Sequence, residues 1–219
     1  MTTSDSDVIP FSRLVRERTA RGHSGSESAT FMSDLMTGEG TREDYVALVA
    51  QHYFLYETLE AVQPAMRHNP TVAPFLSLAL TRMPALTADL EFLLGTDWEA
   101  HIAPLPVTRR YTQRIREVAA DWPAGYVAHH YTRYLGDLSG GQYIAKVMAQ
   151  RFGLGTNGIG FYLFDQIADP AEFKNSYRAE LDAAAWSNEE RERVIDEVMV
   201  AYTFNTDMFV ALAEERDAA

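Results

Sequence analysis

The segment Tyr134-Leu135-Gly136-Asp137-Leu138-Ser139-Gly140-Gly141-Gln142 places three glycines and one carboxylate within what otherwise reads as a long helix. Each glycine costs a helix interior about 1 kcal/mol relative to alanine. Gly136 and Gly140 are four residues apart, so they share one helix face and leave its backbone bare. A bare face admits either a flat, bulky ligand or a second helix at close range.

Asp137 favours the ligand over the second helix. It follows Gly136 directly, which places it about 100° round the helix, at the rim of the bare face. A carboxylate buried without a partner at a tight helix crossing would be costly. Glycine spacing alone is a weak motif, so close helix packing stays open as an alternative.

The rest of the sequence has helical periodicity, and we find no convincing strand. Thr41 and Asp44 predict the capped start of a long helix; its buried stripe comprises Tyr45, Leu48, Val49, His52, Leu55, Tyr56 and Leu59. Further helices are expected from Pro10 toward Gly22 and at about 72–82, 84–94, 107–120, 123–152, 170 onward and 188 onward. We predict one all-α domain over residues 9–219, a multi-helix bundle of about eight helices, after a short disordered leader at residues 1–8.

The net charge of -12 argues against nucleic acid or an acidic membrane surface as a partner. The longest apolar runs stop far short of the ~20 residues that a membrane span needs. The polar N-terminus lacks the basic and apolar regions of a secretory signal. We therefore expect a soluble cytoplasmic protein, and nothing demands more than a monomer.

The chain has no cysteine. This excludes disulfides, thiolate-ligated heme, cysteine-held iron–sulfur clusters and cysteine nucleophiles. A di-iron carboxylate site needs Glu-x-x-His pairs, and no histidine here has an acid three residues before it.

Histidine is therefore the leading candidate for binding a metal, and the chain has six. His23 stands out because Glu27 lies four residues on, where its carboxylate can accept the other ring N–H and fix the tautomer. His52 falls on a buried stripe and is expected in the core. His129 and His130 are expected to pack or hydrogen-bond beside the glycine-rich segment.

Basic side chains gather near the same candidate site. Four arginines lead up to His23, among them Arg16, while Lys174 and Arg178 share a face one turn apart on a later helix. Solvated helix surface is the ordinary fate of such charges. The functional alternative is that they pair with carboxylates on a flat ligand, such as the two propionates of heme.

Two stretches of the sequence resemble the heme oxygenases, specifically the soluble bacterial type that produces biliverdin. They are Ala128-His129-His130-Tyr131-Thr132-Arg133-Tyr134-Leu135-Gly136-Asp137-Leu138-Ser139-Gly140-Gly141-Gln142 and the segment from His23 through Leu35. The resemblance extends from about Phe11 to Ala213. It implies a heme held between a proximal helix, whose His23 binds the iron with Glu27 as hydrogen-bond partner, and a kinked distal helix lined by Gly136 and Gly140.

The same resemblance implies roles for further residues. Asp137 is expected to act as the distal acid through ordered water, with Tyr53 and Arg133 supporting its network. The remaining expected contacts are Arg16, Tyr131, Lys174 and Arg178 at the propionates, and Phe204 and Asn205 in the pocket and its water network. Arg16 stands where relatives often carry lysine. Gly22 and Gly25 flank His23 where relatives have better helix formers, so we expect the proximal helix to fray there.

The activity implied is oxidative cleavage of heme b, which is both cofactor and substrate, to biliverdin, carbon monoxide and ferrous iron. The retained basic set suggests the usual α-meso position. Molecular oxygen and an external electron donor are required, and the local Arg and Lys cluster could dock a ferredoxin or a flavoprotein reductase. The purpose, iron acquisition or pigment supply, stays open.

A non-catalytic heme carrier or sensor on the same fold is the alternative. Such a protein would need His23 and the basic side chains but not Asp137, so the full set of Tyr53, Arg133 and Asp137 favours the enzyme. A bundle hydrolase of the thiaminase type would need a cysteine nucleophile, which the chain lacks.

Overall fold

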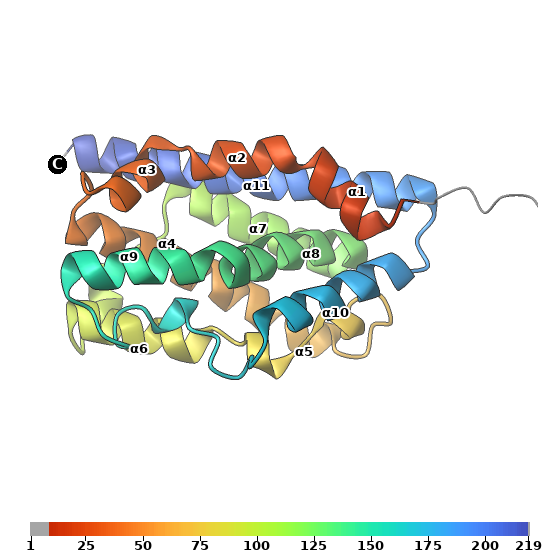
Figure 1. The fold of residues 1–219 in the computed structure, drawn as a ribbon, viewed down its shortest axis with the longest axis horizontal. Helices are drawn as coiled ribbons and strands as arrows, with labels where there is room; N and C mark the ends of the chain where they lie inside the picture. The colour runs from red at the N-terminus through yellow and green to blue at the C-terminus, as the bar shows by residue number, and fades with distance from the viewer. Residues whose placement is uncertain (1–8, 219) are drawn as a thin grey trace, which may run out of the picture.

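The computed structural model describes residues 9–218, and within them every regular element is helical (Figure 1). The all-α prediction is confirmed; the predicted leader at residues 1–8 lies outside the described residues. The α-helices are α1 Phe11–Arg18, α2 Ala20–Glu27, α3 Thr30–Thr37, α4 Arg42–Ala61, α5 Gln63–Met66, α6 Met83–Leu94, α7 Pro106–Asp121, α8 Pro123–His130, α9 Gln142–Phe152, α10 Pro170–Ala183 and α11 Asn188–Asp217.

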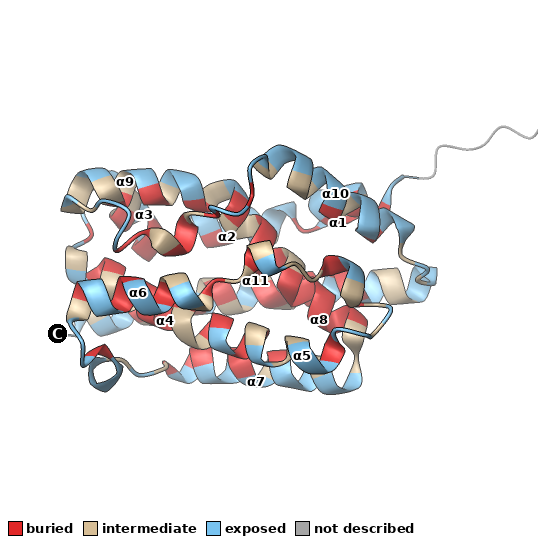
Figure 2. Cartoon of the chain, turned by 90° about the horizontal axis from the view of Figure 1, so that it is seen from below, coloured by how far each residue is buried: buried red, intermediate tan, exposed pale blue. Residues whose placement is uncertain are grey.

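Two packing groups organise the bundle. The long α11 packs against α2, α3, α7 and α8, while α4 packs against α6 and α7. Figure 1 shows α2 running alongside α11, and α8 continuing into α9 as one rod across the middle of the molecule. Figure 2 shows buried residues concentrated on the inward faces and on α8. The glycine-rich segment of that rod is half-buried: Leu138 and Gly141 are buried, whereas Ser139 and Gln142 are exposed.

Helix α4 begins as the sequence predicts. The Thr41 backbone N–H donates to Asp44 Oδ2 at 2.7 Å, and the Asp44 N–H donates to Thr41 Oγ1 at 3.1 Å, which forms a reciprocal capping box. Every residue of the predicted stripe is buried, His52 included. The capping box and the stripe together set which face of α4 points to the core.

The helix predicted over residues 72–82 is wrong. The chain forms two short 3-10 turns instead, Ala73–Phe75 and Leu78–Leu80, with the Ser77 side chain accepting from the Ala79 N–H at 3.3 Å. The buried Arg82 guanidinium donates to the carbonyls of Leu80 at 3.1 Å and Leu163 at 2.8 Å. Local turn chemistry and a buried cation thus outweigh the apolar periodicity of this stretch.

The first predicted helix is also divided. It breaks at Thr19, whose φ of -99° and ψ of 4° separate α1 from α2, and the Thr19 hydroxyl donates to the Val15 carbonyl at 2.9 Å. The break redirects the chain, so Arg16 and His23 are carried by different helices.

Candidate active site

The glycine-rich segment lies in the middle of the rod formed by α8 and α9. Its backbone follows two π-helical turns, Tyr131–Leu135 and Asp137–Gly141, in place of a regular α-helix. Such widened turns inside α-helices are frequent at functional sites. They provide the irregularity that the predicted kink required.

The three glycines serve two purposes. A Cβ built on Gly136 or Gly140 would meet no atom within 4 Å, so both face open space. A Cβ on Gly141 would lie 2.7 Å from the Tyr162 ring, so that glycine permits close packing. The face shared by Gly136 and Gly140 is therefore open, with no second helix packed on it, while Gly141, about 100° further round the helix, packs against Tyr162.

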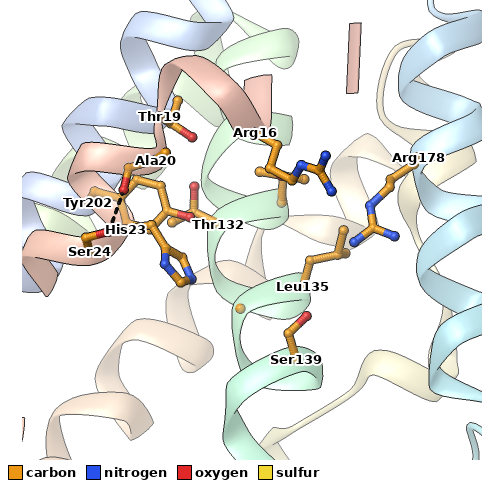
Figure 3. Close-up of a pocket in the computed structure, with 12 residues that line it drawn as sticks. Arg16, Thr19, Ala20, His23, Ser24, Thr132, Leu135, Ser139, Arg178 and Tyr202 are labelled. Carbon is orange, nitrogen blue, oxygen red and sulfur yellow. Dashed lines mark hydrogen bonds between the residues drawn. The ribbon is translucent and has the colours of Figure 1, made fainter. Parts of the chain in front are cut away.

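A two-lobed cavity lies against the open face. The lobes have volumes of about 280 and 300 Å³ and share His23, Thr132, Gly136 and Tyr202 in their linings. One lobe is polar at its far end, where Figure 3 shows the guanidinium groups of Arg16 and Arg178 reaching in from two helices. The other is walled largely by apolar side chains, including Met32, Met36, Ile144 and Phe209.

His23 lies between the two lobes. Its Nδ1 is 3.3 Å from Glu27 Oε2, the contact that the spacing predicts. Figure 3 shows the imidazole projecting from α2 toward the glycine-rich rod. A carboxylate beside Nδ1 favours the tautomer with its proton on that nitrogen, which leaves the Nε2 lone pair available to a metal.

The predicted fraying around His23 is wrong, because α2 is continuous from Ala20 to Glu27. A Cβ on Gly22 would lie 3.0 Å from Tyr202 Cβ and 3.1 Å from Met199 Sδ on α11. The missing side chain therefore lets the proximal helix dock closely on α11. This tertiary packing offsets the weak helix propensity of glycine.

Asp137 belongs to a hydrogen-bonded network that includes Arg133. The Tyr56 hydroxyl donates to Asp137 Oδ2, and the Arg133 guanidinium lies 3.5 Å from the same oxygen while donating to Asn205 Oδ1 at 3.0 Å. Burial raises the pKa of the Asp137 carboxyl, and the Arg133 charge opposes that rise. The protonated form of Asp137 is therefore more favoured in this site than it would be for an aspartic acid in water.

Tyr53 does not join this network, and its predicted supporting role is a misassignment. Its ring packs edge-on against Trp98, with ring centroids 4.9 Å apart. Tyr56, three residues along α4, makes the contact instead. Sequence reasoning placed Tyr56 on the buried stripe but did not connect it to the acid.

The structure also sorts the other predicted contacts. Arg16, Tyr131 and Arg178 line the polar lobe, and Lys174 Nζ donates to Ser139 Oγ at 3.3 Å at its edge. Asn205 lines the apolar lobe, whereas Phe204 stacks on Tyr111 with centroids 4.8 Å apart and lines neither lobe. On α11, the cavity residues that the sequence did not predict are Tyr202 and Phe209. Their spacing from Asn205 puts all three on one face of α11 and turns Phe204 away.

Three of the other histidines lie where the sequence predicts them. His52 is buried in the core beside Phe161, with centroids 5.0 Å apart. His129 Nε2 lies 2.8 Å from Glu197 Oε1, and His130 Nδ1 lies 2.9 Å from the Tyr177 hydroxyl. Burial lowers the pKa of His130 to about 3, so its imidazole is neutral. These three histidines are structural, and His23 is the one that lines the cavity.

The fold and the site define an all-α protein with an imidazole facing a glycine-lined helix and an acid beside it. Residues 9–211 match the heme oxygenase family model, and the chain belongs to that family of oxidoreductases. It is 37% identical over 199 residues to the heme oxygenase of Pyropia yezoensis, covering 90% of this chain and 84% of that one. It is 36% identical to heme oxygenase 1 of Pongo abelii, covering 96% and 74%.

Solved structures agree with this assignment. The crystal structure of heme oxygenase-1 from Synechocystis sp. PCC6803, in complex with heme, has a TM-score of 0.90 and 33% identity, with 94% of both chains covered. That of heme oxygenase from Leptospira interrogans has a TM-score of 0.87 and 33% identity, covering 92% of this chain and 98% of that one. Among the described residues, no helix is long and apolar enough to cross a membrane.

Proposed function

We propose that this heme oxygenase binds heme b between α2 and the glycine-rich rod and opens its ring at the α-meso carbon, giving biliverdin, carbon monoxide and ferrous iron. The observation that carries the proposal is the shared wall of the two lobes. His23 and Gly136 line both, so a flat molecule that spans the lobes passes between an imidazole and bare backbone.

The residues present fit heme at both ends. Arg16 and Arg178 reach into the polar lobe, where they would pair with the propionates, and Met32 and Phe209 line the lobe that would take the apolar edge. This asymmetry favours one direction of insertion. A fixed direction gives the ring one in-plane orientation, which supports a single site of cleavage; we assign it to the α-meso carbon.

Bound heme supplies the iron that activates molecular oxygen and the porphyrin that is oxidised. The protein's part is to orient the ring and to deliver protons. We assign the proton-holding role to the Asp137 carboxyl, because burial raises its pKa and because it lines the cavity beside Gly136 and Gly140. Tyr56 and Arg133 hold that carboxyl in place.

Electrons come from an external donor in this proposal, a ferredoxin or a flavoprotein reductase. Arg16, Arg178 and Lys174 stand at the polar edge of the cavity in a chain whose net charge is -12. A local basic surface of this kind attracts an acidic donor despite the overall charge. The monomeric state and the cytoplasmic location stay predictions.

Titration with hemin tests the proposal, comparing wild type with His23→Ala. We expect a stoichiometric complex for wild type, followed by loss of the Soret band and appearance of biliverdin when a reductant and oxygen are added. His23→Ala should change the axial-ligand spectrum and abolish turnover. A stable heme spectrum under reductant would instead support the carrier, and an unaltered His23→Ala complex would contradict the ligand assignment.

A further inference from the structure

Arg151 joins the far end of the rod to the end of α3. It lies in the last turn of α9, and its guanidinium donates to three backbone carbonyls, those of Leu35, Gly38 and Gly40. The bond to Gly38 measures 2.8 Å and that to Gly40 measures 2.5 Å. One side chain therefore forms hydrogen bonds with both the end of α3 and the turn that follows it.

These carbonyls need such a donor. The last carbonyls of a helix have no partner within it. Gly38 ends α3 in the left-handed conformation, with φ of 114°, and the Gly40 N–H folds back to the Asp34 carbonyl at 2.9 Å. The planar guanidinium presents several fixed donors to the acceptors left over, which an ammonium group does less well. Arg151 therefore ties the end of α3 directly to the last turn of α9.

The two helices joined in this way form facing walls of the apolar lobe. Met32 and Met36 come from α3, and Ile144 comes from α9. Gly140 also lines the lobe and precedes the first residue of α9, Gln142. Arg151 lies seven residues beyond Ile144, or about 10 Å along the helix axis. It does not line the cavity, yet it joins two helices that do.

We propose that Arg151 is a positioning residue that fixes the width of the apolar lobe and so restricts the bound heme to one in-plane orientation. This inference rests on the proposed function, because it concerns the in-plane orientation of the bound ring. A second contact, the ion pair of Arg216 with Asp34 at 2.8 Å, joins α3 to α11 and not to α9.

The test compares Arg151→Ala and Arg151→Lys with a matched control, Arg18→Ala. The control removes an exposed arginine that joins α1 to α11 through Glu192 at 2.6 Å, away from the lobe. Two quantities are measured: the rate of heme transfer to apomyoglobin, without turnover, and the proportions of the four biliverdin isomers. Thermal unfolding of each apoprotein identifies any variant that fails to fold.

We expect Arg151→Ala to lose heme about tenfold faster than wild type, which corresponds to about 1.4 kcal/mol, and to yield additional isomers. Arg151→Lys should restore part of both properties, and Arg18→Ala should match wild type. Wild-type isomer proportions and heme-transfer rate in a folded Arg151→Ala protein would overturn the proposal. If the wild-type protein makes no biliverdin, the proposed function fails. The heme-transfer rates of the Arg151 variants still test whether Arg151 holds the apolar lobe in shape.

Discussion

Asp137 is largely buried, with its side chain 13% exposed, beside the Tyr56 hydroxyl and the Arg133 guanidinium. These two neighbours act on its proton in different ways. Tyr56 stabilises the carboxylate through a hydrogen bond, and the Arg133 charge lowers the pKa that burial raises. Burial acts to lower the Arg133 pKa, but the Asp137 charge raises it overall, so the guanidinium stays charged. The acid is therefore held in one orientation while it keeps an affinity for protons.

Replacing Asp137 with alanine should separate binding from chemistry. We expect Asp137→Ala to bind hemin with little change, because the imidazole and the basic side chains remain. Loss of a positioned general acid typically costs at least about 100-fold in rate, so biliverdin formation should fall by that order or divert to another product. Stopped-flow spectra and pigment analysis measure both effects. Normal biliverdin yield would remove Asp137 from the mechanism.

Tyr56 and Tyr53 provide a matched pair on one helix. Tyr56→Phe removes the hydroxyl that bonds Asp137, whereas Tyr53→Phe removes one from a ring packed on Trp98. We expect the first variant to slow ring opening and to raise the apparent pKa of the acid in a pH–rate profile, since a bond to its charged form is lost. The second should match wild type. Equal profiles for the two variants would show that the contact is irrelevant.

The sequence already contained the means to choose between these tyrosines. Tyr56 belongs to the buried stripe of α4, and Tyr53 does not, so periodicity alone points Tyr56 inward. What it could not indicate is which buried partner Tyr56 meets, because Asp137 lies 81 residues away in the chain. The spacing of His23 and Glu27 involves one helical turn only, and that pair was correctly predicted.

The glycine-rich rod shows how one element combines opposite requirements. Its backbone is helical at Gly136, with φ of -61° and ψ of -54°, so an alanine fits there without strain. Open space beside Gly136 and Gly140 contrasts with the Tyr162 ring pressed against Gly141. Alanine at Gly136 and alanine at Gly141 should therefore change the free energy of unfolding in opposite directions.

We expect Gly136→Ala to stabilise the apoprotein by about 1 kcal/mol, the difference in helix propensity, and to weaken heme binding because a methyl group enters the cavity. Gly25→Ala is the control, since its Cβ also meets open space but lies outside both lobes. Gly25→Ala should raise the stability of the apoprotein and leave heme binding unchanged.

Gly141→Ala should destabilise the apoprotein by about 1–3 kcal/mol through overpacking. Urea unfolding and hemin titration test all three; unchanged heme affinity in Gly136→Ala would contradict the placement of the ligand.

Element boundaries were predictable where local chemistry sets them. The caps at Thr41 and Ser187 satisfy backbone donors within three residues, and both helices begin there. The 3-10 turns after Val72 were not predictable, because they depend on Arg82, whose guanidinium bonds carbonyls near residue 163. Long-range hydrogen bonds of this kind leave no periodic signal in the sequence.

At the scale of the whole molecule, a buried carboxylate joins three helices. Glu197 on α11 accepts two bonds from Arg114 on α7, at 2.8 and 2.6 Å, and lies 2.8 Å from His129 Nε2 on α8. Burial alone would raise the Glu197 pKa, but these donors lower it to about 2. The bundle is therefore stabilised by the ionised form of Glu197.

This arrangement predicts how the apoprotein responds to acid. Because the folded-state pKa is below the unfolded one, the stabilisation is present above about pH 4.5 and is lost as the pH falls toward 2. Glu197→Gln should cost on the order of 2 kcal/mol at neutral pH, with a difference from wild type that shrinks through this window. Urea unfolding at several pH values measures it, with the exposed Glu192→Gln as control. A difference independent of pH would exclude the ionised carboxylate as the cause.

The overall class of the molecule followed from sequence because it depends on repeated local patterns, whereas the cavity depends on packing between distant segments. Met32, Tyr202 and Phe209 line the cavity through the meeting of α3 and α11, and no motif marked them as ligand contacts. Helix propensity marks Gly22 as a weakness of α2, whereas its close approach to Tyr202 makes it a packing position. Tertiary contacts decide these assignments.

The junction at Thr19 gives this architecture two independently adjustable parts. Arg16 lies on α1 and His23 lies on α2. A change in the tilt of α1 therefore moves the Arg16 guanidinium without moving the His23 imidazole. A substitution on the buried face of α1 would therefore displace the cationic end of the cavity first, and the imidazole would stay where the packing of α2 on α11 places it.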